Sequence, residues 1–495
     1  MIALLLILIP LLTGLAGFFL RNEKAVRSWT LLSAIATLAV SVVGLTAFRT
    51  SDALHFTAPW MSTLGSSFAI SLDGMSQLLC LLNAIAYVII IIGTWNSAYR
   101  RPNNFFGLML LAQAGMMGVF LALDALVFYF FWELALIPVY FLCSQWGGEK
   151  RIAVTFKFFI YTFIGSLLML VSILYVYSYT PDQSFAWSSF TKAALPGGDQ
   201  GWLFWLFFIA FAVKMPIFPF HTWQPDTYEQ SPTAVTMVLS GVMVKMGVFG
   251  VLRWLLPVFP FASYSWGDVI SGLSIAGMIY ASLIAMRQDD IKRLVAYSSI
   301  AHIGLMSLAI FSVNEIAVQG VMVQMFNHGI NIIGLWVVAE LIERQTGTRK
   351  LSELGGLAQK APALAILFIV ISFANIALPL TNAFVGEFLM FTGIFDSRVT
   401  QFSMLYTVLA GVCIILAAAY TLRMIRKIFY GETVLLTMNV RDIKLNEKLA
   451  LGIVVVLVIW GGVYSKPFLD VTKPVSHKIT NDILSKPELL QFLKK

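Results

Sequence analysis

Six ionisable side chains lie deep inside apolar segments of this chain, each about 9 to 14 residues into its segment. They are Glu133, Lys214, Lys245, His302, His328 and Glu387. At ~1.5 Å per residue, that depth corresponds to the middle of a bilayer. A charge there costs about 2.5–3.5 kcal/mol on insertion scales, so such groups are expected to pair or to have a function.

Carboxylates, amines and imidazoles at one depth can pass a proton along the membrane plane, and we interpret the row as a proton path. In this hypothesis Glu133 and Lys214 form a switchable pair. While Glu133 is close, its carboxylate stabilises the Lys214 ammonium, and its withdrawal favours release of the proton. Lys245 then receives the proton, the two histidines relay it, and Glu387 passes it to the opposite face.

Each of these residues also has a structural interpretation. Glu133 and Lys214 could form an ion pair that fastens two helices, Lys245 could extend to an interface, and the histidines could be neutral core residues. The depth of Lys245 argues against extension to an interface. Lys214 lies two residues before Pro216, where a break would admit water, and this favours the functional interpretation.

The elements that would position these residues are membrane helices. Hydrophobic residues make up 59% of the chain and charged residues 12%, whereas soluble domains are about 45–50% apolar. Apolar runs long enough to cross a ~30 Å core recur about fourteen times. They cover approximately 2–20, 28–48, 75–97, 105–123, 125–145, 153–179, 202–221, 232–256, 267–286, 293–312, 315–342, 362–394, 402–427 and 448–465. The sequence therefore predicts an all-α integral membrane protein.

Two of these runs contain prolines that should break the helix. Pro216 and Pro219 interrupt residues 202–224, and Pro379 interrupts residues 362–394. Carbonyls freed by proline persist in a bilayer only where they face other helices or water. Because the breaks fall in the seventh and twelfth runs, we expect two inverted repeats of five helices, spans 4–8 and 9–13. The alternative is that proline is simply common in membrane helices.

This pattern divides the chain into five parts. They are N-terminal helices 1–3 (1–104), a first repeat (105–256), a second repeat (267–427), helix 14 (448–465) and a C-terminal surface tail (466–495). The tail mixes charges with prolines, so we expect it to lie on the surface or to cover a partner.

Lysine and arginine gather in alternate loops, which predicts orientation. The rich loops are 21–27, 98–104, 146–152, 222–231, 287–293, 343–361 and 428–447, whereas the opposite loops hold little beyond Arg49, Lys192 and Arg398. Both termini are therefore expected outside the cytoplasm. The first run precedes its positive charges and lacks a basic start, so we interpret it as a retained helix and not as a secretory signal. The net charge of +8 reflects topology and is poor support for nucleic-acid binding.

Cofactor motifs are not apparent in the sequence. Cys80, Cys143 and Cys413 stand singly, without the spacing of an iron–sulfur or zinc site. There is also no Walker loop and no dinucleotide-binding glycine pattern. We expect no metal, nucleotide or redox centre in this chain.

Three motifs resemble a known family. "FAVKMPIFPFHTWQPDTYEQSPTAVTMVLSGVMVKMGVFGVLR" (211–253), "IKRLVAYSSIAHIGLM" (291–306) and "LDGMS" (72–76) are similar to the proton-translocating antiporter-like subunits of respiratory complex I and of Mrp-type cation/proton antiporters. Three features look like the M-type subunits of NADH:quinone oxidoreductase: "WGGEKRIAVTFKFFIYTFIGSLLML" (146–170), the fourteen-helix length and the glutamate at Glu387.

The resemblance implies proton-path roles for the six ionisable residues of the row. It implies a subunit of a proton-pumping translocase in a bacterial inner membrane, between subunits L and N. NADH, FMN, iron–sulfur and quinone chemistry would then belong to other subunits.

One position departs from the family pattern. After Asp226 the family often has Ala-His, whereas this chain has Thr227-Tyr228 followed by Glu229. If that histidine serves proton uptake elsewhere, uptake here must use other groups, for which His221, Asp226 and Glu229 are candidates.

Two other functions remain open from the sequence. A subunit of an Mrp-type Na⁺/H⁺ antiporter would share the lysine row and the broken helices. A structural membrane scaffold would tolerate apolar replacements of the buried charges.

Overall fold

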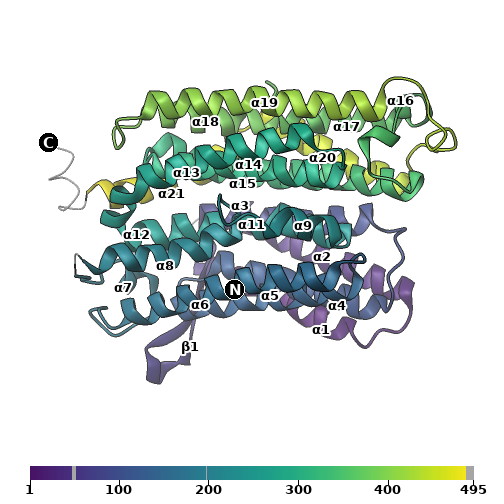
Figure 1. Cartoon of the computed structure of the whole chain (residues 1–495). Coiled ribbons are helices and arrows are strands. Elements are labelled where there is room, and N and C mark those ends of the chain that lie inside the picture. Colours follow the sequence, from purple (N-terminus) through teal and green to yellow (C-terminus); the bar gives the residue numbers. More distant parts are fainter. Residues whose placement is uncertain (47–51, 197, 486–495) are drawn as a thin grey trace.

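The computed structural model describes residues 1–46, 52–196 and 198–485, and most of them lie in helices arranged side by side (Figure 1). Eleven helices in these ranges are long and apolar enough to cross a membrane, so the chain is an integral membrane protein. They are α2 (Glu23–Thr46), α3 (Gly74–Gly93), α4 (Pro102–Leu121), α5 (Ala125–Trp146), α6 (Arg151–Tyr177), the continuous segment Thr233–Val258, α13 (Pro260–Arg287), α14 (Ile291–Phe311), α15 (Glu315–Thr346), α19 (Ser403–Phe429) and α20 (Leu445–Val463). The apolar helix α1 (Ile2–Gly17) is shorter.

The segment Thr233–Val258 is fully buried but is not a uniform α-helix. It consists of α10 (Thr233–Val238), the π-helical turn η3 (Leu239–Met243), α11 (Val244–Gly250), a second π-helical turn η4 (Val251–Leu255) and α12 (Leu256–Val258). π-Helical turns are rare and occur frequently at functional sites. Here they flank the short helix that carries Lys245.

The chain is interrupted at the two places where the sequence predicts a break, around Pro216 and Pro219 and around Pro379. Helix α8 (Asp199–Lys214) ends before Pro216, and α9 (Trp223–Gln230) begins after Pro219. Proline supplies no amide hydrogen, so carbonyls before the break need other donors. The indole Nε1 of Trp223 donates to the carbonyl of Val213 at 2.9 Å, and this bond bridges the break.

A second interruption separates α17 (Pro362–Asn375) from α18 (Asn382–Phe395). The turn around Pro379 places Ala377 and Leu380 in the left-handed region, with φ of 53° and 74°. Residues with side chains rarely adopt this conformation, so the packing around the turn must hold it. Asn327 of α15 contributes by donating its amide to the carbonyl of Asn382 at 2.7 Å.

The two halves of the sequence occupy two halves of the bundle (Figure 1). Elements up to α12 lie in its lower half, and α13 to α20 lie in its upper half. Helices α3 and α15 pack against each other between the halves, and both also contact α20 and α21 (Lys466–Leu484). Short helices α7 (Trp187–Phe190), α16 (Leu357–Lys360) and η5 (Leu351–Glu353) lie in connecting loops.

A β-hairpin between α2 and α3 is the main departure from the predicted all-helical fold. Strand β1 (His55–Met61) pairs antiparallel with β2 (Ser66–Ser71), between the 3-10 turns η1 (Asp52–Leu54) and η2 (Ser62–Leu64). The hydropathy pattern missed it because it detects membrane spans, and this segment is a short polar and aromatic connection. Gly65 closes the turn with φ of 73°.

The C-terminal segment forms helix α21, which lays one face on the bundle. Its buried residues recur at helical spacing and are Phe468, Thr472, Ser476, Ile479, Thr480 and Ile483. Gln319 of α15 donates its amide to the carbonyl of Leu469 at 2.9 Å. Residues 486–495 of the predicted tail, and Arg49 of the predicted outer loops, lie outside the described residues.

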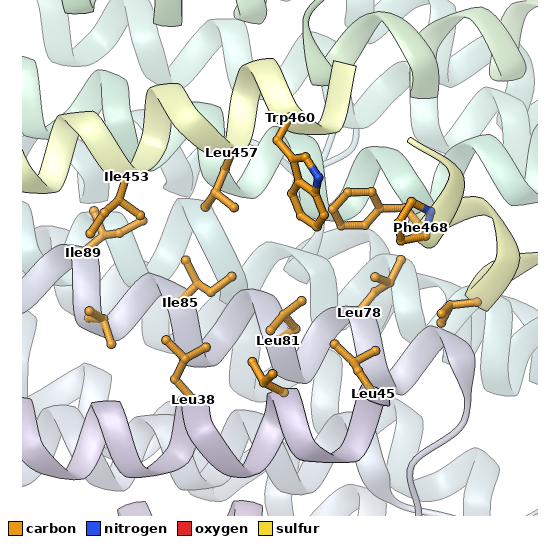
Figure 2. A pocket seen from close by; sticks show the side chains of 14 residues that line it. Leu38, Leu45, Leu78, Leu81, Ile85, Ile89, Ile453, Leu457, Trp460 and Phe468 are labelled. Atoms are coloured by element: carbon orange, nitrogen blue, oxygen red, sulfur yellow. The ribbon is translucent and has the colours of Figure 1, made fainter. Parts of the chain in front are cut away.

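An apolar groove lies apart from the row of ionisable residues. It has a volume of about 530 Å³ and lies between α2, α3, α20 and α21 (Figure 2). Its lining consists of hydrophobic side chains such as Leu81, Ile85, Leu457 and Phe468. These residues offer no group that could accept or donate a proton.

Asp124 joins the hairpin to the membrane helices. Its carboxylate accepts from the backbone amides of Leu126 and Val127, which caps α5, and from Ser66 and Ser67 of β2. Asn314 caps α15 in the same way, because its side-chain oxygen accepts from the backbone amides of Ile316 and Ala317. Among the described residues it does not bond to a second element as Asp124 does.

We expect Asp124→Ala to lower the apparent melting temperature of the purified protein more than Asn314→Ala does. Both lose a helix cap, worth ~1 kcal/mol. Asp124→Ala also strands buried donors of the hairpin, at about 1.5–3 kcal/mol per charge-assisted bond. Equal losses in the two variants, measured by thermal denaturation, would contradict the anchoring role.

Candidate functional site

Four of the six row residues follow one another from α11 in the first half of the bundle to α18 in the second. The amine of Lys245, on α11, lies 2.9 Å from Nδ1 of His328 on α15. The rings of His328 and His302, on α14, have centroids 5.6 Å apart. Nδ1 of His302 lies 3.2 Å from Oε1 of Glu387 on α18. One side chain from each of four helices therefore links the centre of the bundle to the second break.

Glycines allow the helices to approach closely enough for this chain to form. A Cβ on Gly329 would lie 2.8 Å from the carbonyl oxygen of Gly241, so α15 and η3 meet with backbone against backbone. Gly329 directly follows His328, and Gly241 lies about one turn before Lys245. The amine of Lys245 also donates to the carbonyl of Ser240 at 2.6 Å, which fixes its direction.

Glu387 is buried and supported by a neighbouring amide. Gln324 of α15 donates Nε2 to Oε1 of Glu387 at 3.4 Å. Gly386 makes room for this contact, because a Cβ there would lie 2.4 Å from Oε1 of Gln324. A cavity of about 20 Å³ borders His302 and Glu387, which is enough for about one water molecule.

The first half of the bundle holds its charges further apart. Lys214 is the last residue of α8, is 1% exposed, and has no hydrogen-bond partner for Nζ among the described residues. Its amine lies 5.3 Å from the ring centroid of Trp132, in a cation–π contact. Glu133, on α5, interacts electrostatically with Lys214 and with the Ser166 hydroxyl. Within the described ranges, Glu133 and Lys214 form no direct ion pair.

The first break and the Lys245 helix are packed directly on one another. A Cβ on Gly247 would lie 2.8 Å from the carbonyl of Phe211 and 2.9 Å from the amide of Met215. Side chains of Lys214 and Lys245 do not touch in the described residues, but their backbone segments do. A movement of the break would therefore be transmitted to α11.

Of the secondary candidates, His221 lies inside the bundle and the two acids lie in a charge network. His221 is buried against Phe218 and Tyr280, with ring centroids 5.7 and 5.2 Å away. Asp226 pairs with Lys157 at 3.0 Å and with Arg293 at 3.1 Å.

Glu229 holds the centre of the same network. Its carboxylate pairs with Arg293 at 2.8 Å and Arg349 at 2.5 Å. Arg349 also pairs with Asp290, at the start of α14. Burial raises the pKa of Asp290, and the Arg349 guanidinium opposes that rise. The network ties α9 to the start of α14 and to the loop after α15, so Glu229 and Asp226 are paired rather than free acceptors.

Sequence reasoning missed several residues that complete the row. Trp132 beneath Lys214, Gln324 beside Glu387, and Ser240 beneath Lys245 each contact an ionisable residue. Gln324 carried a signal, because an amide in an apolar run one turn from His328 is unusual. Trp132 and Ser240 are ordinary residues of membrane helices, so only packing reveals their role. Within 1–46, 52–196 and 198–485, no group of three or more His, Cys, Asp or Glu is arranged to hold a metal ion.

We expect Gly247→Leu to destabilise the protein, because it would push α11 off the break. Overpacking of this kind costs about 1–3 kcal/mol. The matched control is Gly452→Leu in α20, where a Cβ meets nothing within 4 Å. The apparent melting temperature should fall for Gly247→Leu only, and an unchanged value for that variant would contradict the close approach.

Comparisons with known proteins agree with this architecture. The family description "NADH:quinone oxidoreductase/Mrp antiporter, TM" matches residues 122–413. NADH-quinone oxidoreductase subunit M of Rhodobacter capsulatus is 37% identical over 476 residues, which cover 93% of this chain and 91% of that protein.

Solved structures give the same result. A chain of respiratory complex I from Thermus thermophilus superposes with a TM-score of 0.90 at 28% identity, covering 98% of this chain and 100% of that one. A chain of the Mrp complex from Dietzia sp. DQ12-45-1b has a TM-score of 0.86 at 19% identity, over 100% of this chain and 99% of that one, which shows a shared fold alone. This chain therefore belongs to the NADH:quinone oxidoreductase/Mrp antiporter family of membrane subunits.

Proposed function

We propose that this chain is the M-type antiporter-like subunit of an NADH:quinone oxidoreductase, and that it carries protons across the membrane as electrons pass from NADH to quinone elsewhere in the complex. The observation that carries the proposal is the continuous row Lys245, His328, His302 and Glu387. Such buried ionisable groups are costly unless they serve transport. A scaffold would have no use for them.

In the proposed mechanism the two halves act in sequence. Withdrawal of Glu133 removes a stabilising negative charge from Lys214, and the amine releases its proton toward Lys245. His328 and His302 pass it on, each accepting a proton on one ring nitrogen and losing one from the other. Glu387, beside the second break, delivers it to the outer face. The wide spacing of Glu133 and Lys214 supports a pair that opens and closes.

The architecture we propose has about fourteen membrane crossings. Helices α8 and α9 would form one broken crossing and α17 and α18 another, and residues 105–256 and 267–427 would be inverted repeats of each other. The protein would lie in a bacterial inner membrane between subunits L and N, with both termini outside the cytoplasm. NADH, FMN, iron–sulfur clusters and quinone would be bound by other subunits.

An Mrp-type Na⁺/H⁺ antiporter subunit is the alternative. Its support is the shared fold, at 19% identity. Similarity to subunit M extends over nearly the whole chain at nearly twice that identity, so the complex I function is favoured. Copurification with an NADH-oxidising assembly would support this choice, whereas copurification with Mrp-type partners would overturn it.

We expect Lys214→Met to abolish proton translocation by the assembled complex, because the variant retains the bulk but not the charge of the lysine. Translocation is measured as acidification of proteoliposomes during NADH oxidation. Lys360→Met, which removes an exposed lysine on α16, is the control and should pump normally. Normal pumping by an assembled Lys214→Met complex would refute the assignment.

Orientation can be tested by cysteine labelling, since Cys80, Cys143 and Cys413 are all buried. We expect a membrane-impermeant maleimide added to intact spheroplasts to modify Gln401→Cys and to leave Glu149→Cys unmodified. Both positions are exposed, in loops at opposite ends of the helices. The reverse labelling pattern would contradict the proposed topology.

A further inference from the structure

The segment Thr233–Val258 and helix α15 contact each other at two places, one at the midplane and one near the membrane surface. At the midplane, Lys245 contacts His328 at 2.9 Å. Nearer the surface, the hydroxyl of Thr233 donates to Oε2 of Glu340. Because Thr233 precedes Lys245 while Glu340 follows His328, the segment Thr233–Val258 and α15 run antiparallel. About 12 residues, or roughly 18 Å, separate the two contacts on each helix.

That distance matches the path from the midplane of a ~30 Å hydrocarbon core to its edge. The Thr233–Glu340 contact therefore lies where the buried row would meet the surface rich in lysine and arginine. Neither residue belongs to the proton path described above. Among the described residues Glu340 forms no ion pair, and its carboxylate accepts hydrogen bonds from the hydroxyls of Thr233 and Ser97.

A polar cavity opens beside this contact. It has a volume of about 370 Å³ and is lined by residues including Lys292, Glu343 and Arg349. The buried amine of Lys292 pairs with Glu343 at 2.5 Å and donates to the Thr233 hydroxyl at 3.2 Å. Glu340 is thus two hydrogen bonds from a side chain that lines an open, polar cavity.

Polar groups continue inward from Thr233 on one helical face. Thr236 and Ser240 follow at the spacing of one and two turns, and both are fully buried. Thr236 donates to the carbonyl of Tyr228, and the carbonyl of Ser240 accepts from the amine of Lys245. This series of polar groups therefore ends at Lys245, which belongs to the row of ionisable residues.

Two further buried polar atoms lie beside this face. The ring of Tyr228 packs edge to face with that of Trp336, with centroids 5.9 Å apart, and Trp336 is one turn from Glu340 on α15. Oη of Tyr228 and Nε1 of Trp336 have no hydrogen-bond partner among the described protein groups. Buried polar atoms of this kind are normally satisfied by internal water. Further in, the side chain of Ile333 packs directly on Gly241.

We propose that Glu340 is a proton-uptake residue that supplies Lys245 directly from the cytoplasmic side, through Thr233, Thr236, Ser240 and intervening water. The proposal rests on the proton-pumping function proposed above. Protonated Glu340 releases its proton to the water chain, and the neutral Lys245 amine gains one from the other end. The Glu340 carboxylate then takes a proton from hydronium that enters the polar cavity from the cytoplasmic side and leaves water behind, so charge and atoms balance. Lys245 is loaded by this path first, and the proton that Lys214 releases toward it then displaces the Lys245 proton to His328.

A pair of variants separates this role from a structural one. Glu340→Gln keeps the length and an acceptor for Thr233 but cannot carry a proton, whereas Glu340→Asp keeps the proton but shortens the side chain. We expect the rate of proton translocation in proteoliposomes to fall in Glu340→Gln to within about twofold of the Lys245→Met rate, and Glu340→Asp to retain most of the activity. Tolerance of Gln together with loss in Asp would overturn the proposal.

The matched control is Glu353→Gln, which alters an exposed acid that also accepts from a threonine hydroxyl, that of Thr348. It should pump normally. If Glu340→Gln pumps normally while Lys214→Met and Lys245→Met do not, the uptake role is wrong and the pumping function stands. If the two lysine variants also pump normally, the pumping function itself fails.

Discussion

The cost of placing charge in a medium that cannot solvate it governs this molecule. Each ionisable group at midplane depth would cost about 2.5–3.5 kcal/mol alone, so the fold must bring such groups together or give them polar neighbours. Groups are brought together between α11 and α18, where an amine, two imidazoles and a carboxylate follow one another. Lys214, in the first half of the bundle, instead has a favourable neighbour, because its amine lies over the face of the Trp132 ring.

Broken helices follow from the same constraint applied to the backbone. Proton transfer along a row of polar side chains requires water. Backbone groups that lack a partner within their own helix are tolerated inside a membrane only where they face other protein groups or such water. Both proline-containing breaks lie beside a row residue, since Lys214 ends α8 and Glu387 lies in the first turns of α18. Trp223 and Asn327 then satisfy carbonyls at the two breaks. The breaks are therefore local and do not unravel their helices.

The halves differ in a way that suits directional transport. Lys245, His328, His302 and Glu387 follow one another at short distances, and in the proposed mechanism a proton would move among them by small changes in geometry. Glu133 and Lys214 are not in direct contact, and the link from the first break to α11 is made through backbone packing at Gly247. In the proposed mechanism, Glu133 and Lys214 can separate, whereas the four residues from Lys245 to Glu387 stay close together. Proton transfer would then be controlled between these two groups.

Much of this could be predicted from the sequence. Hydropathy located the apolar segments, prolines located the interruptions, and ionisable residues in apolar runs identified the row, because each of these is a local cost that a sequence displays directly. The side-chain partners could not be predicted: the contact of Lys245 with His328, the support of Lys214 by Trp132, and the β-hairpin held by Asp124 depend on which helix faces meet. A hydropathy pattern gives the depth of a residue in the membrane, but its neighbours at that depth are decided by packing between segments far apart in the chain.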